Sequence, residues 1–192
     1  MSSKAELRRR CRAQRDALPL AQVESDSALI RRQVWQLPEW RSAGSVFVYA
    51  ATAREVQTLG LIEDLLAREI TIAVPRIVDA SAGTMEAVVV RRLEDLVPGD
   101  FGILTPRGRE TLSGPADLSL LPGLAFSPDT GVRLGLGGGY YDRYLAADRT
   151  STRVGLAFDH QLKPDLPADA HDQPVHAIVT PHHVHRVGHV AD

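Results

Sequence analysis

Apolar residues recur along this chain in two patterns, as short continuous runs and as longer segments with helical spacing. A short, nearly all-apolar run is typical of a strand that is buried on both faces of a parallel sheet. Such runs lie at residues 45–50, 70–75, 85–90, 118–122, 153–158 and 175–180. Helical spacing predicts helices at residues 4–17, 21–37, 59–66 and 140–147. Because strands alternate with helices, the pattern predicts one α/β domain, residues 1–192, around a mainly parallel sheet.

The first predicted helix carries basic side chains beside its buried face. Ser3 and Glu6 have the spacing of a capping box, which predicts that the helix begins at Lys4. At about 100° per residue, Lys4, Arg8 and Arg15 fall within one narrow sector of the helix. A solvated basic face is the commoner outcome for charges on a terminal helix. The alternative is that Lys4 and Arg8, one turn apart, bind the same anion.

A glycine-rich stretch precedes the last predicted helix and reads L-G-L-G-G-G-Y-Y-D-R-Y-L over residues 134–145. Glycine lets the backbone approach a ligand closely or adopt a positive φ. A helix that begins at Tyr140 would direct its free N–H groups toward the glycines, which favours phosphate binding. The spacing fits neither a Walker loop, because no lysine follows, nor the dinucleotide fingerprint, because Tyr140 stands where the third glycine belongs. The alternative is a tight surface turn that only connects a strand to a helix.

A carboxylate, Glu55, follows the first predicted strand within the segment A-T-A-R-E-V-Q-T, residues 51–58. Open α/β sheets bind their ligands at strand-to-helix loops of this kind. An ordinary loop carboxylate would occupy the same position, so position alone does not separate the two interpretations.

Composition limits the class of protein. A net charge of −2 gives no overall attraction to nucleic acid or to a membrane surface. Cys11 is the only cysteine, which excludes an internal disulfide and a cysteine-cluster metal site. No run of about 18 apolar residues is present, so a cytoplasmic location is expected.

The C-terminal segment is rich in histidine. Four of the seven histidines lie between residues 182 and 189. Such clusters can bind metal ions adventitiously. Because no carboxylate accompanies them in a fixed frame, a flexible tail over residues 181–192 is the prediction.

Four segments match the motifs of one known family, in order and in separation. They are K-x-x-L-R at residues 4–8 with Arg15 beyond it, E-V-Q-T at 55–58, L-P-G-L-A-F at 121–126 and G-V-R-L-G-L-G-G-G-Y-Y-D-R at 131–143. On these motifs the chain resembles the 5-formyltetrahydrofolate cyclo-ligases, also called methenyltetrahydrofolate synthetases. The resemblance extends from Lys4 to about residue 180, and its last motif is long and specific.

The resemblance implies a fold, a reaction and its ligands. The fold is a three-layer α/β/α sandwich of the ribose-5-phosphate isomerase and CoA-transferase type. The reaction is the ATP- and Mg²⁺-dependent closure of 5-formyltetrahydrofolate to 5,10-methenyltetrahydrofolate, with release of ADP and phosphate. A monomer is expected, acting on folate with or without a polyglutamate tail and without a nucleic-acid or membrane partner.

Residue by residue, the resemblance also implies where the ligands bind. The ATP site falls on the N-terminal helix (residues 1–18) and the glycine-rich stretch, namely Lys4, Ala5, Glu6, Leu7, Arg8, Arg133, Leu134, Gly135, Leu136, Gly137, Gly138, Gly139, Tyr140 and Tyr141. Lys4 and Arg133 are the implied catalytic cations. Folate contacts fall on Ala50, Glu55 and Tyr141.

The implied magnesium site is less complete. Asp142 is the implied magnesium-associated carboxylate. The chain has Thr105 where the family often has glutamate before proline, and His176 where the family commonly has an aspartate linked to magnesium. Either Asp172 substitutes for that aspartate, or Asp142 and phosphate oxygens hold the metal by themselves.

The chemistry of ring closure agrees with these residues. A formamide is a poor electrophile and hydroxide a poor leaving group, so phosphorylation of the formyl oxygen prepares ring closure by the neighbouring folate nitrogen. Such a site mainly positions its ligands and neutralises charge. Glu55 would accept hydrogen bonds from pterin N–H groups. Two alternatives are an ATP-dependent enzyme with another acceptor and a nucleic-acid binder; balanced charge and few aromatic residues disfavour the latter.

Overall fold

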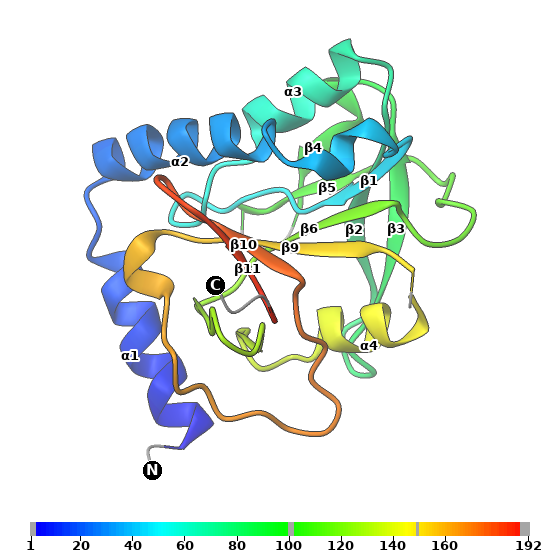
Figure 1. Ribbon diagram of the computed structural model, residues 1–192. Helices are drawn as coiled ribbons and strands as arrows, with labels where there is room; N and C mark the ends of the chain where they lie inside the picture. The colour runs from blue at the N-terminus through cyan, green and yellow to red at the C-terminus, as the bar shows by residue number, and fades with distance from the viewer. Residues whose placement is uncertain (1–2, 100–101, 149, 189–192) are drawn as a thin grey trace.

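The computed structural model describes residues 3–99, 102–148 and 150–188 (Figure 1). Its helices are α1 (Lys4–Asp16), α2 (Leu20–Val34), α3 (Leu59–Ala67) and α4 (Tyr140–Ala147). Its strands are β1 (Ser45–Val48), β2 (Thr71–Asp79), β3 (Thr84–Val90), β4 (Leu96–Pro98), β5 (Leu104–Pro106), β6 (Leu118–Leu121), β7 (Ala125–Phe126), β8 (Arg133–Leu134), β9 (Thr152–Leu156), β10 (Ala177–Val179) and β11 (Val184–Arg186).

The centre of the fold is a seven-stranded sheet in the order β11-β10-β9-β6-β1-β2-β3. The inner strands pair in parallel, whereas β3 and β11 pair antiparallel at the two edges. Two further pairs, β4–β5 and β7–β8, form small separate sheets. The predicted α/β class with a mainly parallel sheet is therefore confirmed.

Successive residues of β1 point to opposite faces of the sheet, so they pack into two separate buried clusters. Val46 and Val48 belong to one buried cluster, which α2 and α3 complete from one side of the sheet. Phe47 points the other way, into a second cluster that includes Leu145 of α4. Because helices cover both faces, the strands carry apolar residues on both sides. The sandwich of three layers follows from this pattern (Figure 1).

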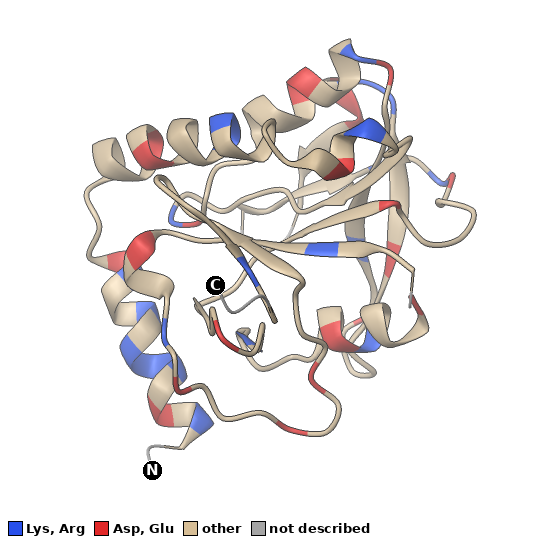
Figure 2. Ribbon diagram, viewed as in Figure 1, with Lys and Arg blue, Asp and Glu red and all other residues tan. Residues whose placement is uncertain are grey.

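Helix α1 lies beside the sandwich and carries a row of basic residues (Figure 2). Its first residue is Lys4, as predicted, and the hydroxyl of Ser3 accepts a hydrogen bond from the Glu6 N–H at 3.2 Å. Cys11 is buried against Leu124 and Leu134 near the β7–β8 pair. The helix is therefore anchored by its apolar residues, with basic side chains on either side of the contact.

Two predictions about elements differ from the structure. Helix α2 ends at Val34, and not at Leu37, because Pro38 begins a separate 3₁₀ turn. The prediction of a flexible C-terminal tail is wrong for residues 184–186, which form β11 beside β10, and Arg186 pairs with Glu39. Residues 189–192, including His189, lie outside the described residues. Within the described ranges, no helix is long and apolar enough to cross a membrane.

Candidate active site

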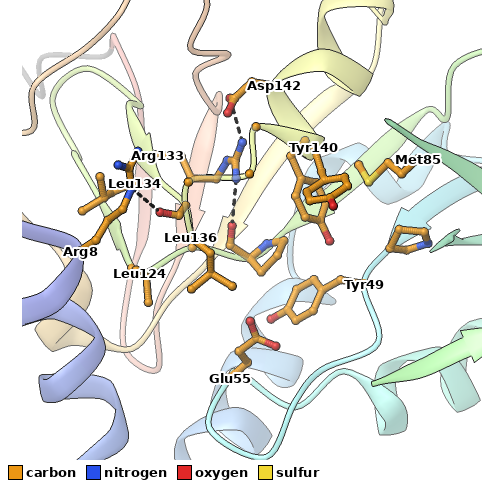
Figure 3. A pocket seen from close by; sticks show the side chains of 18 of the residues that line it. Arg8, Tyr49, Glu55, Met85, Leu124, Arg133, Leu134, Leu136, Tyr140 and Asp142 are labelled. Atoms are coloured by element: carbon orange, nitrogen blue, oxygen red, sulfur yellow. Dashed lines mark hydrogen bonds and ion pairs between the residues drawn. The ribbon is translucent and has the colours of Figure 1, made fainter. Parts of the chain in front are cut away.

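A cavity of about 330 Å³ opens beyond the carboxyl ends of the central parallel strands. Tyr49 and Ala50 follow β1, Pro122 and Gly123 follow β6, and all four line the cavity. Parallel sheets place their ligand sites at this edge, where several loops converge. Two walls face each other across the cavity, and they differ in chemistry (Figure 3).

The polar wall consists of α1, β8 and the segment that follows β8. Its members are Lys4, Arg8, Arg133, Asp142 and residues 135–139, which are called the glycine loop below. The apolar wall consists mainly of side chains from β2, β3 and the segment around β5. Its members are Pro75, Ile77, Met85, Ile103 and Leu104, with Glu55 beside them.

The glycine loop presents free backbone donors. Gly137 and Gly139 have φ values of 105° and 67°, which only glycine adopts without strain. Gly139 also caps the amino end of α4, and no side chain caps that end. Among the described residues, no acceptor bonds the N–H groups of Gly137, Gly138 or Gly139. These unpaired N–H groups, together with the positive end of the helix dipole, favour an anion.

Arg8 lies against this loop. Its Nε donates a hydrogen bond to the Gly135 carbonyl at 3.1 Å, and a Cβ atom on Gly137 would lie 3.5 Å from its guanidinium carbon. Carboxylates pair with the other cationic side chains of the cavity lining, Lys4, Arg15 and Arg133. Within the described part of the chain, no carboxylate pairs with Arg8. Its positive charge is therefore available to a ligand.

Arg133 lies at the back of the polar wall and is almost completely buried, with 3% of its side chain exposed. Its Nη2 donates to Asp142 Oδ1 at 2.9 Å, and its guanidinium lies 5.2 Å from the centre of the Tyr141 ring. Its buried Nε has no hydrogen-bond partner among the described residues, and leaving a buried N–H unpaired is costly.

Lys4 closes the outer end of the polar wall. Its Nζ donates to the carboxylates of Asp169 and Asp172 at 2.7 Å each. Burial would lower the pKa of Lys4, but the hydrogen bonds and negative charges of the two carboxylates together raise it. Burial would raise the pKa of Asp172, but the hydrogen bonds from Lys4 and from the Asp169 N–H, together with the nearby positive charge, lower it. The pair is therefore charged throughout the neutral range.

The other residues implied for the N-terminal part of the ATP site do not line the cavity. Ala5 and Glu6 are exposed, and Glu6 pairs with Arg9 on the outer surface of α1. Leu7 packs against the buried cluster around Cys11. The helix therefore presents one residue per turn to the cavity, as helical periodicity requires.

Glu55 lies on the opposite side from the glycine loop (Figure 3). Its Oε2 accepts hydrogen bonds from the N–H and hydroxyl of Thr52, at 2.8 and 3.0 Å. Its Oε1 lies 3.7 Å from the guanidinium of Arg15. These contacts fix the carboxylate in the loop after β1. Oε1 remains able to accept hydrogen bonds from a ligand in the cavity.

Two tyrosines stand near Glu55. The hydroxyl of Tyr49 donates to the Val56 carbonyl at 2.9 Å. Burial, and to a smaller degree the charge of Glu55, raises the pKa of Tyr141 well above its ordinary value. Both phenols therefore remain protonated at neutral pH, and Tyr141 keeps a hydroxyl donor in the cavity lining.

The apolar wall exposes large side chains to the cavity. Ile77 is 57% exposed and Ile103 is 37% exposed. Exposed apolar side chains that line a cavity favour an apolar or aromatic portion of a ligand. Sequence reasoning missed this wall, because Ile77 lies beyond the strand predicted at residues 70–75 and Met85 has the pattern of an ordinary strand residue.

The residues that depart from the family pattern lie outside the cavity lining. His176 precedes β10 at the amino end of the parallel strands, and its Nδ1 accepts a hydrogen bond from the Arg153 N–H at 3.0 Å. Thr105 lies within β5, but its neighbour Leu104 lines the cavity instead. Neither departure therefore alters the cavity surface directly.

Carboxylates that suit a hard cation are nevertheless present. Asp142 Oδ1 accepts hydrogen bonds from Arg133 and from the Gln173 N–H, the latter at 3.2 Å. Asp169, His171 and Asp172 offer ligand atoms that lie within 4.8 Å of one another at the cavity edge. Carboxylate oxygens are the ligands that Mg²⁺ prefers. Asp169 had no motif to mark it in the sequence.

Comparisons with known proteins identify the family of this chain. The model of the 5-formyltetrahydrofolate cyclo-ligase family matches residues 1–181. A Schizosaccharomyces pombe protein named "Probable 5-formyltetrahydrofolate cyclo-ligase" is 32% identical over 181 residues, covering 85% of this chain and 88% of its own length. The NMR structure of the Aquifex aeolicus 5,10-methenyltetrahydrofolate synthetase is similar with a TM-score of 0.85 and 30% identity, covering 98% of this chain and 95% of that one.

A second solved structure has the same fold at lower identity. The 5,10-methenyltetrahydrofolate synthetase of Mycoplasma pneumoniae is 23% identical with a TM-score of 0.75, covering 94% of this chain and 99% of that one. The family match spans nearly the whole chain and includes every residue of the cavity lining. This protein therefore belongs to the 5-formyltetrahydrofolate cyclo-ligase family.

Proposed function

We propose that this protein converts 5-formyltetrahydrofolate to 5,10-methenyltetrahydrofolate with ATP as second substrate, releasing ADP and phosphate. The observation that carries the proposal is one cavity with two unlike walls. Free loop amides and the unpaired Arg8 lie on one side, and Glu55 with an apolar surface lies on the other. A triphosphate requires anion-binding groups such as the loop amides and Arg8. A pterin requires a hydrogen-bond acceptor beside an apolar surface, and the cavity has both.

The folate would bind along the apolar wall. Glu55 Oε1 would accept hydrogen bonds from pterin N–H groups, because Thr52 already bonds the other carboxylate oxygen. Ile77 and Met85 would contact the flat aryl portion of the substrate. This orientation directs the formyl group toward the glycine loop.

The glycine loop, Arg8 and Arg133 would bind the triphosphate of ATP. The formyl oxygen attacks the terminal phosphorus and ADP departs, so that the formyl oxygen becomes part of a phosphate leaving group. The neighbouring folate nitrogen then attacks the formyl carbon, loses its proton, and phosphate leaves as the five-membered ring closes. The protein contributes position and charge neutralisation, and no nucleophilic side chain is required.

Lys4 and Arg133 are the proposed catalytic cations. Arg133 lines the cavity with its charge held beside Asp142, and Lys4 keeps its charge through two carboxylate partners. Asp142 would hold Mg²⁺, with Asp172 as a further oxygen ligand at the cavity edge. When bound, Mg²⁺ would neutralise part of the phosphate charge.

Coupling between the two substrates tests the proposal. Purified protein with Mg²⁺ and ATP should release ADP only after 5-formyltetrahydrofolate is added, and methenyl absorbance should rise in step with ADP. ADP release that other formamides or pterins stimulate, without methenyl absorbance, would refute the folate assignment. Methenyl formation without ATP would refute the phosphorylation step.

A further inference from the structure

Arg143 connects the glycine loop to a distant turn. It lies in the first half of α4, and it lines a separate surface groove with Thr84 and Asp148 instead of the cavity. Its Nε donates to the Gly83 carbonyl at 2.9 Å, and its Nη2 donates to the Gly138 carbonyl. Gly83 belongs to the turn between β2 and β3, so one guanidinium bonds two segments that are far apart in sequence.

The hydrogen bond to Gly138 determines which way a loop amide points. No peptide bond among the described residues is cis, so the Gly138 C=O and the Gly139 N–H point in opposite directions across a planar peptide. Arg143 bonds the carbonyl from outside the cavity lining, whereas Gly138 and Gly139 themselves line the cavity. The Gly139 N–H is therefore directed toward the cavity.

Glycine is required on both sides of this contact. Gly83 and Gly139 have φ values of 63° and 67°, and a Cβ atom on Gly139 would lie 2.6 Å from Arg143 Nη1. A Cβ atom on Gly83 would also collide with the guanidinium. Among the described residues, no carboxylate pairs with Arg143. Its hydrogen-bonding capacity is devoted to backbone carbonyls.

Tyr140 makes a second connection to the same turn. Its hydroxyl donates to the Ala80 carbonyl at 3.4 Å, and the Arg143 guanidinium lies 5.9 Å from the centre of its ring. The hairpin that this turn closes carries Ile77 and Met85 of the apolar wall. Arg143 therefore connects the glycine loop of the polar wall to the hairpin that carries the apolar wall, through contacts that lie outside the cavity lining.

We propose that Arg143 is a positioning residue, which holds the glycine loop with its amides directed at the triphosphate and keeps that loop in register with the β2–β3 hairpin. The proposal rests on the proposed function, because it assigns the loop to ATP. A lysine at this position has a single ammonium group, so it would bond one carbonyl well and restore only part of the effect.

Steady-state kinetics and calorimetry of three variants test this role. Arg143→Ala should raise the KM and Kd for Mg-ATP about tenfold, because a charged hydrogen bond to the loop is lost. The KM for 5-formyltetrahydrofolate should change less than about threefold, and Arg143→Lys should lie between the wild type and Arg143→Ala. Arg91→Ala is the matched control, since Arg91 is an exposed arginine that pairs with Glu110 outside the cavity lining.

Each outcome decides one question. Arg143→Ala with Mg-ATP binding within twofold of wild type would overturn the positioning role. Equal losses for both substrates, with no recovery in Arg143→Lys, would show a merely structural residue and would also overturn it. Wild-type protein without ATP-dependent methenyl formation would refute the proposed function instead, and calorimetric binding of Mg-ATP would still test Arg143.

Discussion

The two walls of the cavity are built by different means. The polar wall depends on backbone geometry and on charges that the protein already pairs, such as Lys4 with Asp172 and Arg133 with Asp142. The apolar wall depends on large side chains such as Ile77, which remain exposed to the cavity. The first wall is therefore preorganised by hydrogen bonds and the second by shape. Substitutions in the two walls should therefore affect different substrates.

The largest effect is expected at Arg133. Arg133→Ala should lower kcat about 10²-fold, because a buried donor to transition-state charge is removed. Arg133→Lys should retain part of the rate, because it keeps a positive charge beside Asp142. Stopped-flow measurement of methenyl absorbance would check the result. A kcat for Arg133→Ala within threefold of wild type would show that Arg133 does not stabilise the transition state.

Arg8→Ala should weaken Mg-ATP binding about 30-fold, because no carboxylate in the described part of the chain pairs with Arg8. Folate affinity should stay near the wild-type value. Arg12→Ala is the matched control, since Arg12 lies one turn later on α1, is exposed and does not line the cavity. Calorimetry with each substrate separately would measure both constants. If Arg8→Ala and Arg12→Ala lose the same Mg-ATP affinity, Arg8 contributes only to the overall surface charge and makes no specific contact with the ligand.

Glu55→Gln should weaken folate binding and leave Mg-ATP binding unchanged, which is the opposite of the effect expected for Arg8→Ala. The KM for 5-formyltetrahydrofolate should rise about tenfold, because an amide accepts pterin hydrogen bonds less strongly than a carboxylate. Mg-ATP binding should not change. Glu63→Gln on the exposed surface of α3 is the control. A variant with unchanged folate KM, or with weaker ATP binding, would contradict the separation of the two walls.

Ile77→Ser tests the apolar wall with a smaller expected effect. Partial loss of apolar contact should raise the folate KM about threefold without changing Mg-ATP binding. Val78 provides a close control, because it is 62% exposed beside Ile77 and does not line the cavity. If Val78→Ser has the same effect as Ile77→Ser, the apolar wall makes no specific contact with the substrate.

The smallest effect is expected from pH. The pKa of Lys4 is raised and that of Asp172 is lowered, so both stay charged across the neutral range. The stabilisation that Asp172 contributes is present above its ordinary pKa of about 4 and is lost only as pH falls through its lowered value. Mg-ATP affinity should therefore change less than about twofold between pH 7 and 9. A tenfold change by calorimetry would show that the polar wall titrates in this range.

Local patterns predicted much of the fold. The apolar runs marked the central parallel strands because both faces of these strands are buried, and Ser3 marked the beginning of α1 because capping is local. β11 was missed, since a short segment between histidines gains its strand geometry only from pairing with β10.

The candidate site also has some parts that the sequence predicts and others that it does not. The glycine loop and Arg8 were visible in the sequence, because glycine conformation and helical spacing are local properties. The pairing of Lys4 with Asp169 joins residues 165 positions apart, and no sequence pattern announced it. The exposure of Ile77 likewise depends on where the hairpin lies relative to the cavity.

In the proposed function, loop amides beside Arg8 bind a triphosphate next to the folate. NMR measurement of the amide chemical shifts of Gly137, Gly138 and Gly139 during titration with Mg-ATP tests this binding. We expect large, saturable shifts at these amides with Mg-ATP, little change with adenosine, and further binding of 5-formyltetrahydrofolate that shifts the amides of Glu55 and Thr52. Saturation with Mg-ATP that leaves all three glycine amides unmoved, while amides elsewhere shift, would contradict it.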